Sequence, residues 1–286
     1  MPRGVPKAGI RKTQRYLERS VTNTLFDDQY QSESKETDQE VDSRIQERFE
    51  VLQYLADATV SGKSRALIVS GPPGLGKSYT IEQALTNLDP EQYTVIKGFV
   101  RATGLYKTLF QYRNPGCVIV FDDSDSIFMD EGSLSLLKAA CDTTEQRILS
   151  WRAETNMRDE DEQLLPTNFE FNGSVIFITN YDFDKIIEQK QRYHEHMSAM
   201  VSRAFYLDLT MKTKRDFVIR IKQVIESGML SNSLSSQQIN MVVDYIVTNQ
   251  DKLRELSLRM AIKIGKLIEQ YPDRWERIAK ITLLKQ

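Results

Sequence analysis

Residues 71–78 read Gly71-Pro72-Pro73-Gly74-Leu75-Gly76-Lys77-Ser78, and this stretch decides the fold of the 286-residue chain. An apolar run at 66–70 precedes it, and a segment of helical character at 79–87 follows. The pattern G-x-x-x-x-G-K-[ST] between a strand and a helix is typical of a phosphate-binding loop, because its glycines let backbone N–H groups surround phosphate oxygens. The helix N-terminus adds partial positive charge. The alternative is a glycine-rich turn that binds no ligand.

The loop also predicts which side chains would hold a nucleoside triphosphate. We expect Lys77 to supply a cation for the β- and γ-phosphates and Ser78 to supply a hydroxyl for Mg²⁺. We expect the nucleotide to contact the whole stretch, namely Gly71, Pro72, Pro73, Gly74, Leu75, Gly76, Lys77, Ser78 and Tyr79.

Composition narrows the class of protein. Apolar residues make up 40% of the chain, which supports a packed core, and a net charge of −2 argues against a wholly basic protein that coats nucleic acid. The two cysteines, Cys117 and Cys141, lie in or beside apolar segments, so we expect reduced thiols rather than a disulfide framework. No apolar run is long enough to span a membrane, and the basic N-terminus has no apolar signal region. We therefore expect a cytoplasmic protein, in the host cytoplasm if it is viral.

Residues 1–45 differ from the rest. The first twenty are strongly basic, the next stretch is polar and acidic, and few apolar side chains are available for burial. We expect a flexible or partner-ordered arm. Its basic part could contact nucleic-acid phosphates, and a solvated tail without a partner is an equally good interpretation.

The remaining pattern predicts an α/β fold. Five short apolar runs, expected to be strands, alternate with helices at 66–70, 93–97, 117–121, 175–179 and 204–209. Nearly continuous apolar strands are typical of a parallel sheet covered on both faces, so we expect a three-layer P-loop core over 46–210. A β-hairpin insertion is expected at 147–171. A helix is expected over 41–59, where apolar residues such as Phe49 recur at helical spacing, and it would lead into this core. From 211 to 286 only helices are expected, and they would form a small all-α lid domain. We expect one helix at 214–226, one capped by Ser235, one capped by Ser257 and a last one beginning at Pro272.

Polar residues at strand ends predict the second half of the site. Asp122 and Asp123 follow the apolar strand at 118–121, where a P-loop enzyme holds Mg²⁺ through a carboxylate. Asp122 fits that role, and Asp123 could orient or deprotonate an attacking water. Asn180 ends the next strand, which we expect between the phosphate loop and the acidic strand, and could hold that water. The alternatives are a solvated turn for the acids and a turn former for Asn180.

Together, these features resemble the AAA+ ATPases over residues 45–270. The Walker A motif would be 71–78 and the Walker B motif 118–123, with Asn180 at the sensor-1 position. Ser202-Arg203 resembles the arginine-finger position, and Arg259, near the start of a lid helix, resembles sensor 2. The resemblance implies ATP with Mg²⁺ as cofactors. It also implies that Arg203 would reach a neighbour's site and that Arg259 would contact the γ-phosphate in its own.

One departure from the family concerns the end of Walker B. Most members have Asp-Glu there, whereas this chain has Asp122-Asp123. The shorter side chain reaches about one C–C bond less, and a misplacement of that size can cost ~10²-fold in rate. Slow hydrolysis, or a shifted water position, is therefore a live hypothesis.

Three functions remain open. The first is an ATP-hydrolysing oligomeric motor or remodeller that acts on a protein or nucleic-acid client; the family resemblance implies a hexameric ring. Its single-module build resembles bacteriophage-encoded AAA+ ATPases and helicase or clamp loaders, which points to a DNA-associated role in replication. The second is a nucleotide-gated switch or scaffold with slow hydrolysis. The third, a phosphotransferase, is disfavoured by the lid and Arg203. Candidate pore-loop aromatics are Phe99 and Tyr106, for which core positions in the following helix are slightly favoured, and Phe128 within a second candidate loop at 128–131.

Overall fold

A single parallel sheet organises the chain. The computed structural model describes residues 35–152, 157–158 and 162–285. The strands are β1 (Ala66–Ser70), β2 (Tyr93–Lys97), β3 (Val118–Asp122), β6 (Ser174–Thr179) and β7 (Phe205–Asp208). They are all parallel and lie in the order β2-β3-β6-β1-β7. The predicted five-stranded sheet is confirmed, and β6 lies between the phosphate-loop strand β1 and the acidic strand β3, as expected.

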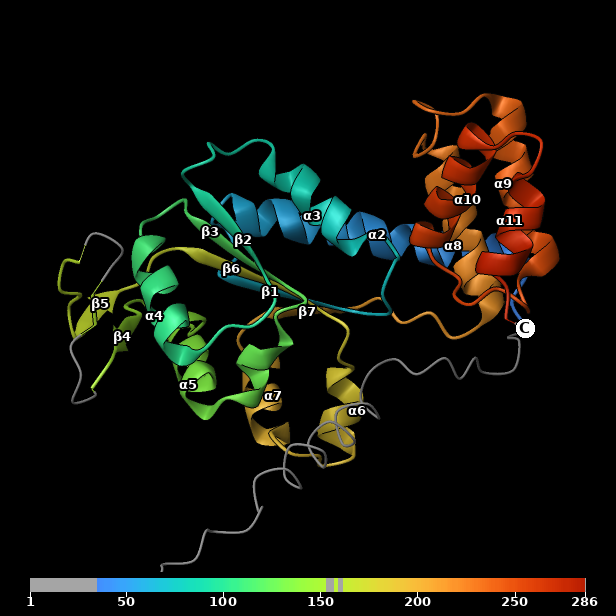
Figure 1. Ribbon diagram of the computed structural model, residues 1–286. Helices are drawn as coiled ribbons and strands as arrows, with labels where there is room; N and C mark the ends of the chain where they lie inside the picture. The colour runs from blue at the N-terminus through green and yellow to red at the C-terminus, as the bar shows by residue number, and fades with distance from the viewer. Residues whose placement is uncertain (1–34, 153–156, 159–161, 286) are drawn as a thin grey trace, which may run out of the picture.

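Helices cover both faces of this sheet (Figure 1). Alternate residues of β1 point to opposite sides: Leu67 and Val69 belong to one apolar cluster and Ala66 and Ile68 to the other. The first face packs against α2 (Asp38–Val60) and α3 (Lys77–Leu85). The second packs against α4 (Ala102–Gln111), α5 (Glu131–Ala140), α6 (Phe183–Glu188) and α7 (His194–Val201). The result is the predicted three-layer α/β core.

Helix α2 begins earlier than the apolar pattern suggests. Thr37 and Glu40 form a capping box, in which each side chain bonds the other residue's backbone N–H, and this box starts the helix at Asp38. Residues 38–45, which we assigned to the arm, are therefore helical. The rest of the predicted arm, apart from 35–37, lies outside the described residues.

The predicted hairpin is a short one. Strands β4 (Ile148–Ser150) and β5 (Asn168–Glu170) pair antiparallel, with Leu149 opposite Phe169. Much of the connection between them lies outside the described residues. The hairpin lies at the opposite end of the molecule from the C-terminal helices (Figure 1).

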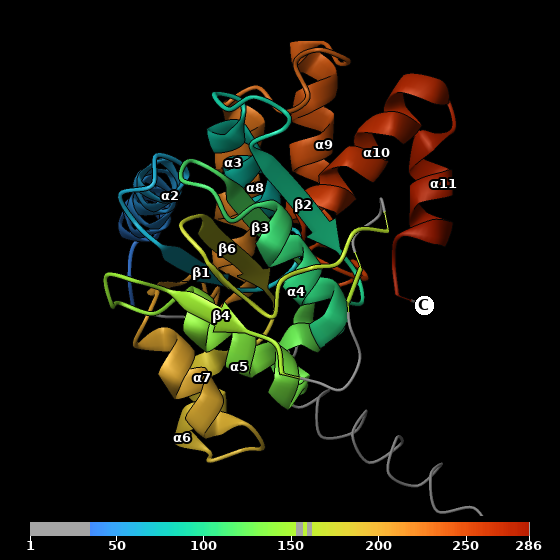
Figure 2. The same cartoon turned by 90° about the vertical axis from the view of Figure 1, so that its left-hand side faces the viewer.

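The C-terminal segment is helical, as predicted. It contains α8 (Lys214–Glu226), α9 (Ser236–Asn249), α10 (Leu258–Gln270) and α11 (Trp275–Thr282). Ser235 and Ser257 cap α9 and α10 through their hydroxyls, as expected. The last helix starts at Trp275 rather than Pro272. These helices group beside the sheet (Figures 1 and 2), and their apolar side chains are continuous with the cluster that includes α2 and α3.

Two of the aromatic pore-loop candidates are core residues. Tyr106 on α4 is fully buried and its hydroxyl donates to the Pro166 carbonyl, 2.8 Å away. Phe128, in the 3-10 helix η1 (Asp125–Met129), is buried against Phe177 and Phe183. Only Phe99 of the three is exposed, with 74% of its surface accessible. Among the residues that the structure describes, no helix has the length and apolar composition needed to span a bilayer.

Candidate nucleotide-binding site

The phosphate loop joins β1 to α3 at the carboxyl end of the sheet. Gly74 and Gly76 have φ values of +76° and +95°. Residues that carry a side chain rarely adopt such values, so the loop needs glycine at both positions. Lys77 begins α3 and is buried. Its ammonium donates to the carbonyls of Gly71 and Pro72 and to Asn180 Oδ1, which is 3.0 Å away. Burial lowers the pKa of Lys77 to about 8, while the nearby carboxylates, Asp123 foremost, act in the opposite direction.

Ser78 and Asp122 lie side by side next to Lys77. The Ser78 hydroxyl donates to Asp122 Oδ1 at 3.0 Å, and Asp122 is buried at the end of β3. A hydroxyl and a carboxylate, both oxygen donors, are the ligand type that Mg²⁺ prefers, usually with retained waters and phosphate oxygens. The donor set therefore fits Mg²⁺.

Asn180 connects the loop to the second acid. Its Nδ2 donates to Asp123 Oδ1 at 2.9 Å, while its Oδ1 accepts from Lys77. Asp123 is exposed and has a φ of +52°, an uncommon conformation for a residue other than glycine. The order β3-β6-β1 brings these three side chains together, because β6 carries Asn180 between the other two strand ends.

A third acid lies behind this group. Asp125 accepts a hydrogen bond from the Thr179 hydroxyl at 2.6 Å. Burial raises the pKa of Asp125 to about 6, and the Thr179 hydrogen bond acts in the opposite direction. Because Thr179 precedes Asn180, the Asp125–Thr179 bond fixes the end of β6 at the point where Asn180 emerges.

The lid packs directly on the phosphate loop. The Leu258 N–H donates to the Gly74 carbonyl at 2.8 Å, and a Cβ added to Gly74 would lie 2.5 Å from Ser257 Cβ. This contact places the start of α10 against the loop. The exposed Arg259 consequently lines the same cavity as Lys77 and Ser78.

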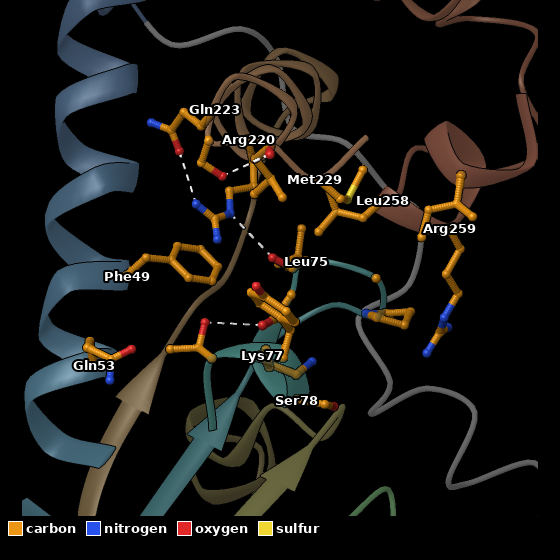
Figure 3. A pocket seen from close by; sticks show the side chains of 18 of the residues that line it. Phe49, Gln53, Leu75, Lys77, Ser78, Arg220, Gln223, Met229, Leu258 and Arg259 are labelled. Atoms are coloured by element: carbon orange, nitrogen blue, oxygen red, sulfur yellow. Dashed lines mark hydrogen bonds between the residues drawn. The ribbon is translucent and has the colours of Figure 1, made fainter. Parts of the chain in front are cut away.

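A cavity of about 990 Å³ lies between the loop, α2 and the lid (Figure 3). Phe49 and Gln53 line it from α2, and Arg220 and Gln223 from α8. The Arg220 guanidinium lies over the Phe49 ring, 3.3 Å from its centroid, and donates to the Leu75 carbonyl. Burial lowers the pKa of Arg220 to about 10. At this size the cavity is in the range of small-molecule and cofactor sites.

Comparison with known proteins gives one relative by sequence. No family model matches the chain. Over 252 residues it is 33% identical to an uncharacterized 36.7 kDa protein of Enterobacteria phage T4, from the nrdC-mobD intergenic region. The match covers 86% of this chain and 77% of the phage protein. The chain belongs to the family of that phage protein.

The strand order, with β6 between the loop strand and the acidic strand, and the helical lid on the loop complete the predicted arrangement. The result is a three-layer α/β fold with a phosphate-binding loop between β1 and α3. Among solved structures, it is similar to the RuvB Holliday junction branch migration motor of Thermotoga maritima, at 16% identity and a TM-score of 0.44. That match covers 82% of this chain and 63% of RuvB. It is also similar to NtrX from Brucella abortus in complex with ATP, at 11% identity and a TM-score of 0.44, covering 92% of this chain and 60% of NtrX. The chain thus spans less than two thirds of each.

Arg203, which was expected to act at a nucleotide site, lies away from this cavity. Arg203 precedes β7, whose Phe205 pairs with Leu67 near the start of β1, so Arg203 lies at the amino end of the strands. Its Nη1 donates to the Ala199 carbonyl at 2.9 Å, and its Nε lies 3.9 Å from Asp142 Oδ1. The phosphate loop lies at the carboxyl end. Arg203 therefore has no contact with the site of its own chain.

Sequence reasoning missed several residues of the site. Lys97 ends β2 and lies 3.0 Å from Asp122 Oδ2. The rule that found Asp122, a polar residue at the carboxyl end of a parallel strand, also applies to Lys97. Arg220 had no such signal, because a basic residue in an amphipathic helix is usually solvated. Phe49 was identified only as an apolar residue of α2.

Proposed function

We propose that this protein is an AAA+ NTPase that binds Mg²⁺-ATP in the cavity between sheet and lid, hydrolyses it, and works as an oligomeric motor or remodeller. The observation that carries the proposal is the convergence on one cavity of Lys77, Ser78 and Arg259, with Asn180 and Asp122 beside them. These residues come from the loop, two neighbouring strands and the lid. Such convergence is what phosphoryl transfer requires, since its catalysis is mostly positioning and charge stabilisation.

Each residue has a role in this proposal. Lys77 exchanges its carbonyl partners for the β- and γ-phosphates, and backbone N–H groups of 71–79 surround the phosphate oxygens. Ser78 and Asp122 would hold Mg²⁺, which would supply positive charge to offset that of the phosphoryl group. Asp123 orients the attacking water or accepts a proton from it. Asn180 fixes the positions of Asp123 and of that water. Arg259 contacts the γ-phosphate, so the lid responds to whether that phosphate is present.

The reason to propose an oligomer is the position of Arg203. Because this side chain lies at the opposite end of the strands from its own phosphate loop, we propose that it completes the site of a neighbouring subunit. An arginine supplied in trans can raise turnover by about 10³-fold or more. A ring, a hexamer on the family's pattern, would bring each Arg203 to the next site.

A switch or scaffold with slow hydrolysis is the second candidate. It is favoured by Asp123, which lines the cavity with a short side chain and accepts a hydrogen bond from Asn180 at 2.9 Å. Under this alternative, ATP binding alone would set the lid position.

The client is proposed only as a class. The family relationship to a phage protein supports a phage-type role, and a DNA-associated function in replication or loading is the form we propose. A protein client is the alternative that the test distinguishes.

Steady-state ATP hydrolysis against protein concentration, with and without single- and double-stranded DNA, tests the proposal. A specific rate that climbs with concentration supports the oligomeric motor, and stimulation by DNA supports the DNA-associated form. Tight ATP binding with negligible turnover at every concentration would instead support the switch.

A further inference from the structure

The carboxylate expected to hold the metal already has a cation beside it. Lys97 Nζ lies 3.0 Å from Asp122 Oδ2, while Ser78 uses the other oxygen, Oδ1. Sheet register creates this pair, because Lys97 and Asp122 are directly paired residues of the parallel strands β2 and β3. The two strands lie side by side in Figure 1. Both oxygens of Asp122 are therefore engaged.

A second acid faces Lys97 from α3. Glu82 Oε1 lies 3.6 Å from Lys97 Nζ. Ser78 and Glu82 are four residues apart on α3 and so share one face of the helix. This face contacts the end of β3 through Ser78 and the end of β2 through Glu82. The ammonium thus lies between two carboxylates, directly next to the oxygens that would hold Mg²⁺.

The two partners differ in their exposure to water. The Asp122 side chain is 7% exposed and the Lys97 side chain 59%. A buried carboxylate is costly without a counter-charge, whereas a half-solvated ammonium on a flexible stem can return to water cheaply. Lys97 is therefore an exchangeable counter-ion rather than part of a fixed buried pair.

We propose that Lys97 is a built-in counter-ion of Asp122 that competes with Mg²⁺ and thereby sets the magnesium requirement for nucleotide binding. The inference rests on the proposed binding of a magnesium nucleotide at this site. Lys97 neutralises Asp122 when Mg²⁺ is scarce, so the diphosphate of a nucleotide does not meet a bare carboxylate. When Mg²⁺ binds, repulsion between the two cations weakens the Lys97–Asp122 contact. Lys97 is a positioning residue in this account, since it acts through Asp122.

Binding of a fluorescent ADP analogue, in EDTA and across a Mg²⁺ titration, tests the proposal without using activity. Lys97→Met removes the charge, and we expect it to lower the Mg²⁺ concentration for half-maximal binding by roughly tenfold, because a nearby cation no longer repels the metal. In EDTA the same variant should bind the analogue roughly fivefold more weakly, because Asp122 then repels the diphosphate. Lys97→Gln, which keeps a hydrogen-bond donor, should behave like Lys97→Met.

Two controls separate this role from general charge effects. Lys97→Arg keeps the charge and should match the wild type. Lys107→Met makes the same change in net charge on the exposed side of α4, across the sheet from α3, and should also match. Thermal unfolding checks that each variant folds, and Lys97→Gln replaces Lys97→Met if the latter does not.

The outcomes are distinguishable. An unchanged Mg²⁺ midpoint in Lys97→Met and Lys97→Gln, or an equal shift in Lys107→Met, overturns the role of Lys97 and leaves the proposed function intact. Absence of nucleotide binding in the wild type overturns the proposed function and this inference with it.

Discussion

At the scale of single residues, the site depends on carboxylates in unequal surroundings. Asp122 is buried and doubly engaged, Asp123 is exposed and bonded to Asn180, and Asp125 is bonded to Thr179. These differences separate their roles: Asp122 suits the metal, Asp123 suits the water, and Asp125 suits support of the strand end.

Asp125 gives a prediction about stability and pH. Its pKa is about 6 in the folded chain, against an ordinary value of 3.8. The folded state therefore holds the proton more tightly, and the free energy of unfolding falls as pH rises from about 4 to about 6. Asp125→Asn cannot ionise, yet its side-chain oxygen can still accept from Thr179. Above pH 7 the variant should exceed the wild type in stability by about 2 kcal/mol, a figure that allows for partial exposure to water.

Thermal unfolding in EDTA at pH 4.5 and 7.5 measures this difference. The gain of Asp125→Asn over the wild type should be larger at the higher pH. An equal gain at both pH values, or a loss only at pH 7.5, would refute the assignment of a raised pKa.

Asp123 gives a prediction about turnover. If the short side chain limits hydrolysis, Asp123→Glu should raise the maximal rate of ATP hydrolysis by up to ~10²-fold, because the carboxylate would reach about one C–C bond further. Asp123→Asn, which retains the size but cannot take a proton, is the matched control and should lower the rate. Wild-type-like turnover in Asp123→Glu, with no gain, would count against the limitation.

At the scale of elements, the contact between the phosphate loop and α10 couples the lid to the site. It consists of the Leu258 N–H on the Gly74 carbonyl and the close approach of Gly74 to Ser257. Since Arg259 follows Leu258, any shift of the helix start moves Arg259 relative to the phosphates.

Gly74→Ala tests this coupling, and Gly62→Ala is its control. The two glycines have φ values of +76° and +74°, so alanine is strained equally at both, by about 1 kcal/mol. Only at Gly74 would the new Cβ meet another residue, at 2.5 Å, whereas nothing lies within 4 Å at Gly62. We expect both variants to lose a similar amount of stability from backbone strain. Nucleotide binding should weaken at least tenfold in Gly74→Ala alone, because a loss of about 1.4 kcal/mol in binding free energy raises Kd tenfold. Equal nucleotide affinities for the two variants would contradict the coupling.

The elements also show what the sequence could predict. Strand positions followed from short apolar runs bounded by turn residues, and β1, β2 and α8 have the expected bounds. Helix starts were less accurate, because the Thr37 capping box and the delayed start at Trp275 depend on local hydrogen bonds that apolar spacing does not report. The motifs predicted only that the Asn180 strand lies between the loop strand and the acidic strand; the rest of the strand order came from the structure. The lid–loop contact and the Arg220–Phe49 stacking join residues far apart in the chain and had no local signal.

At the scale of the whole molecule, the two ends of the sheet carry different candidate functional residues. The carboxyl end carries the phosphate loop, the acids and the lid contact, and the amino end carries Arg203 beside Asp142. On our proposal, the site of a single chain is incomplete, and a second copy supplies the missing arginine. Hydrolysis by an isolated subunit should therefore be slow, and assembly should accelerate it.

A mixing experiment tests this central claim most directly. Lys77→Met disables a subunit's own loop but keeps its Arg203, and Arg203→Ala keeps the loop but removes the arginine. Each variant alone should hydrolyse ATP far more slowly than the wild type, and Arg203→Ala should still bind ATP. If Arg203 acts on a neighbour, an equimolar mixture should hydrolyse ATP well above the sum of the two separate rates. A mixture no faster than that sum, or full activity in Arg203→Ala alone, would contradict the account.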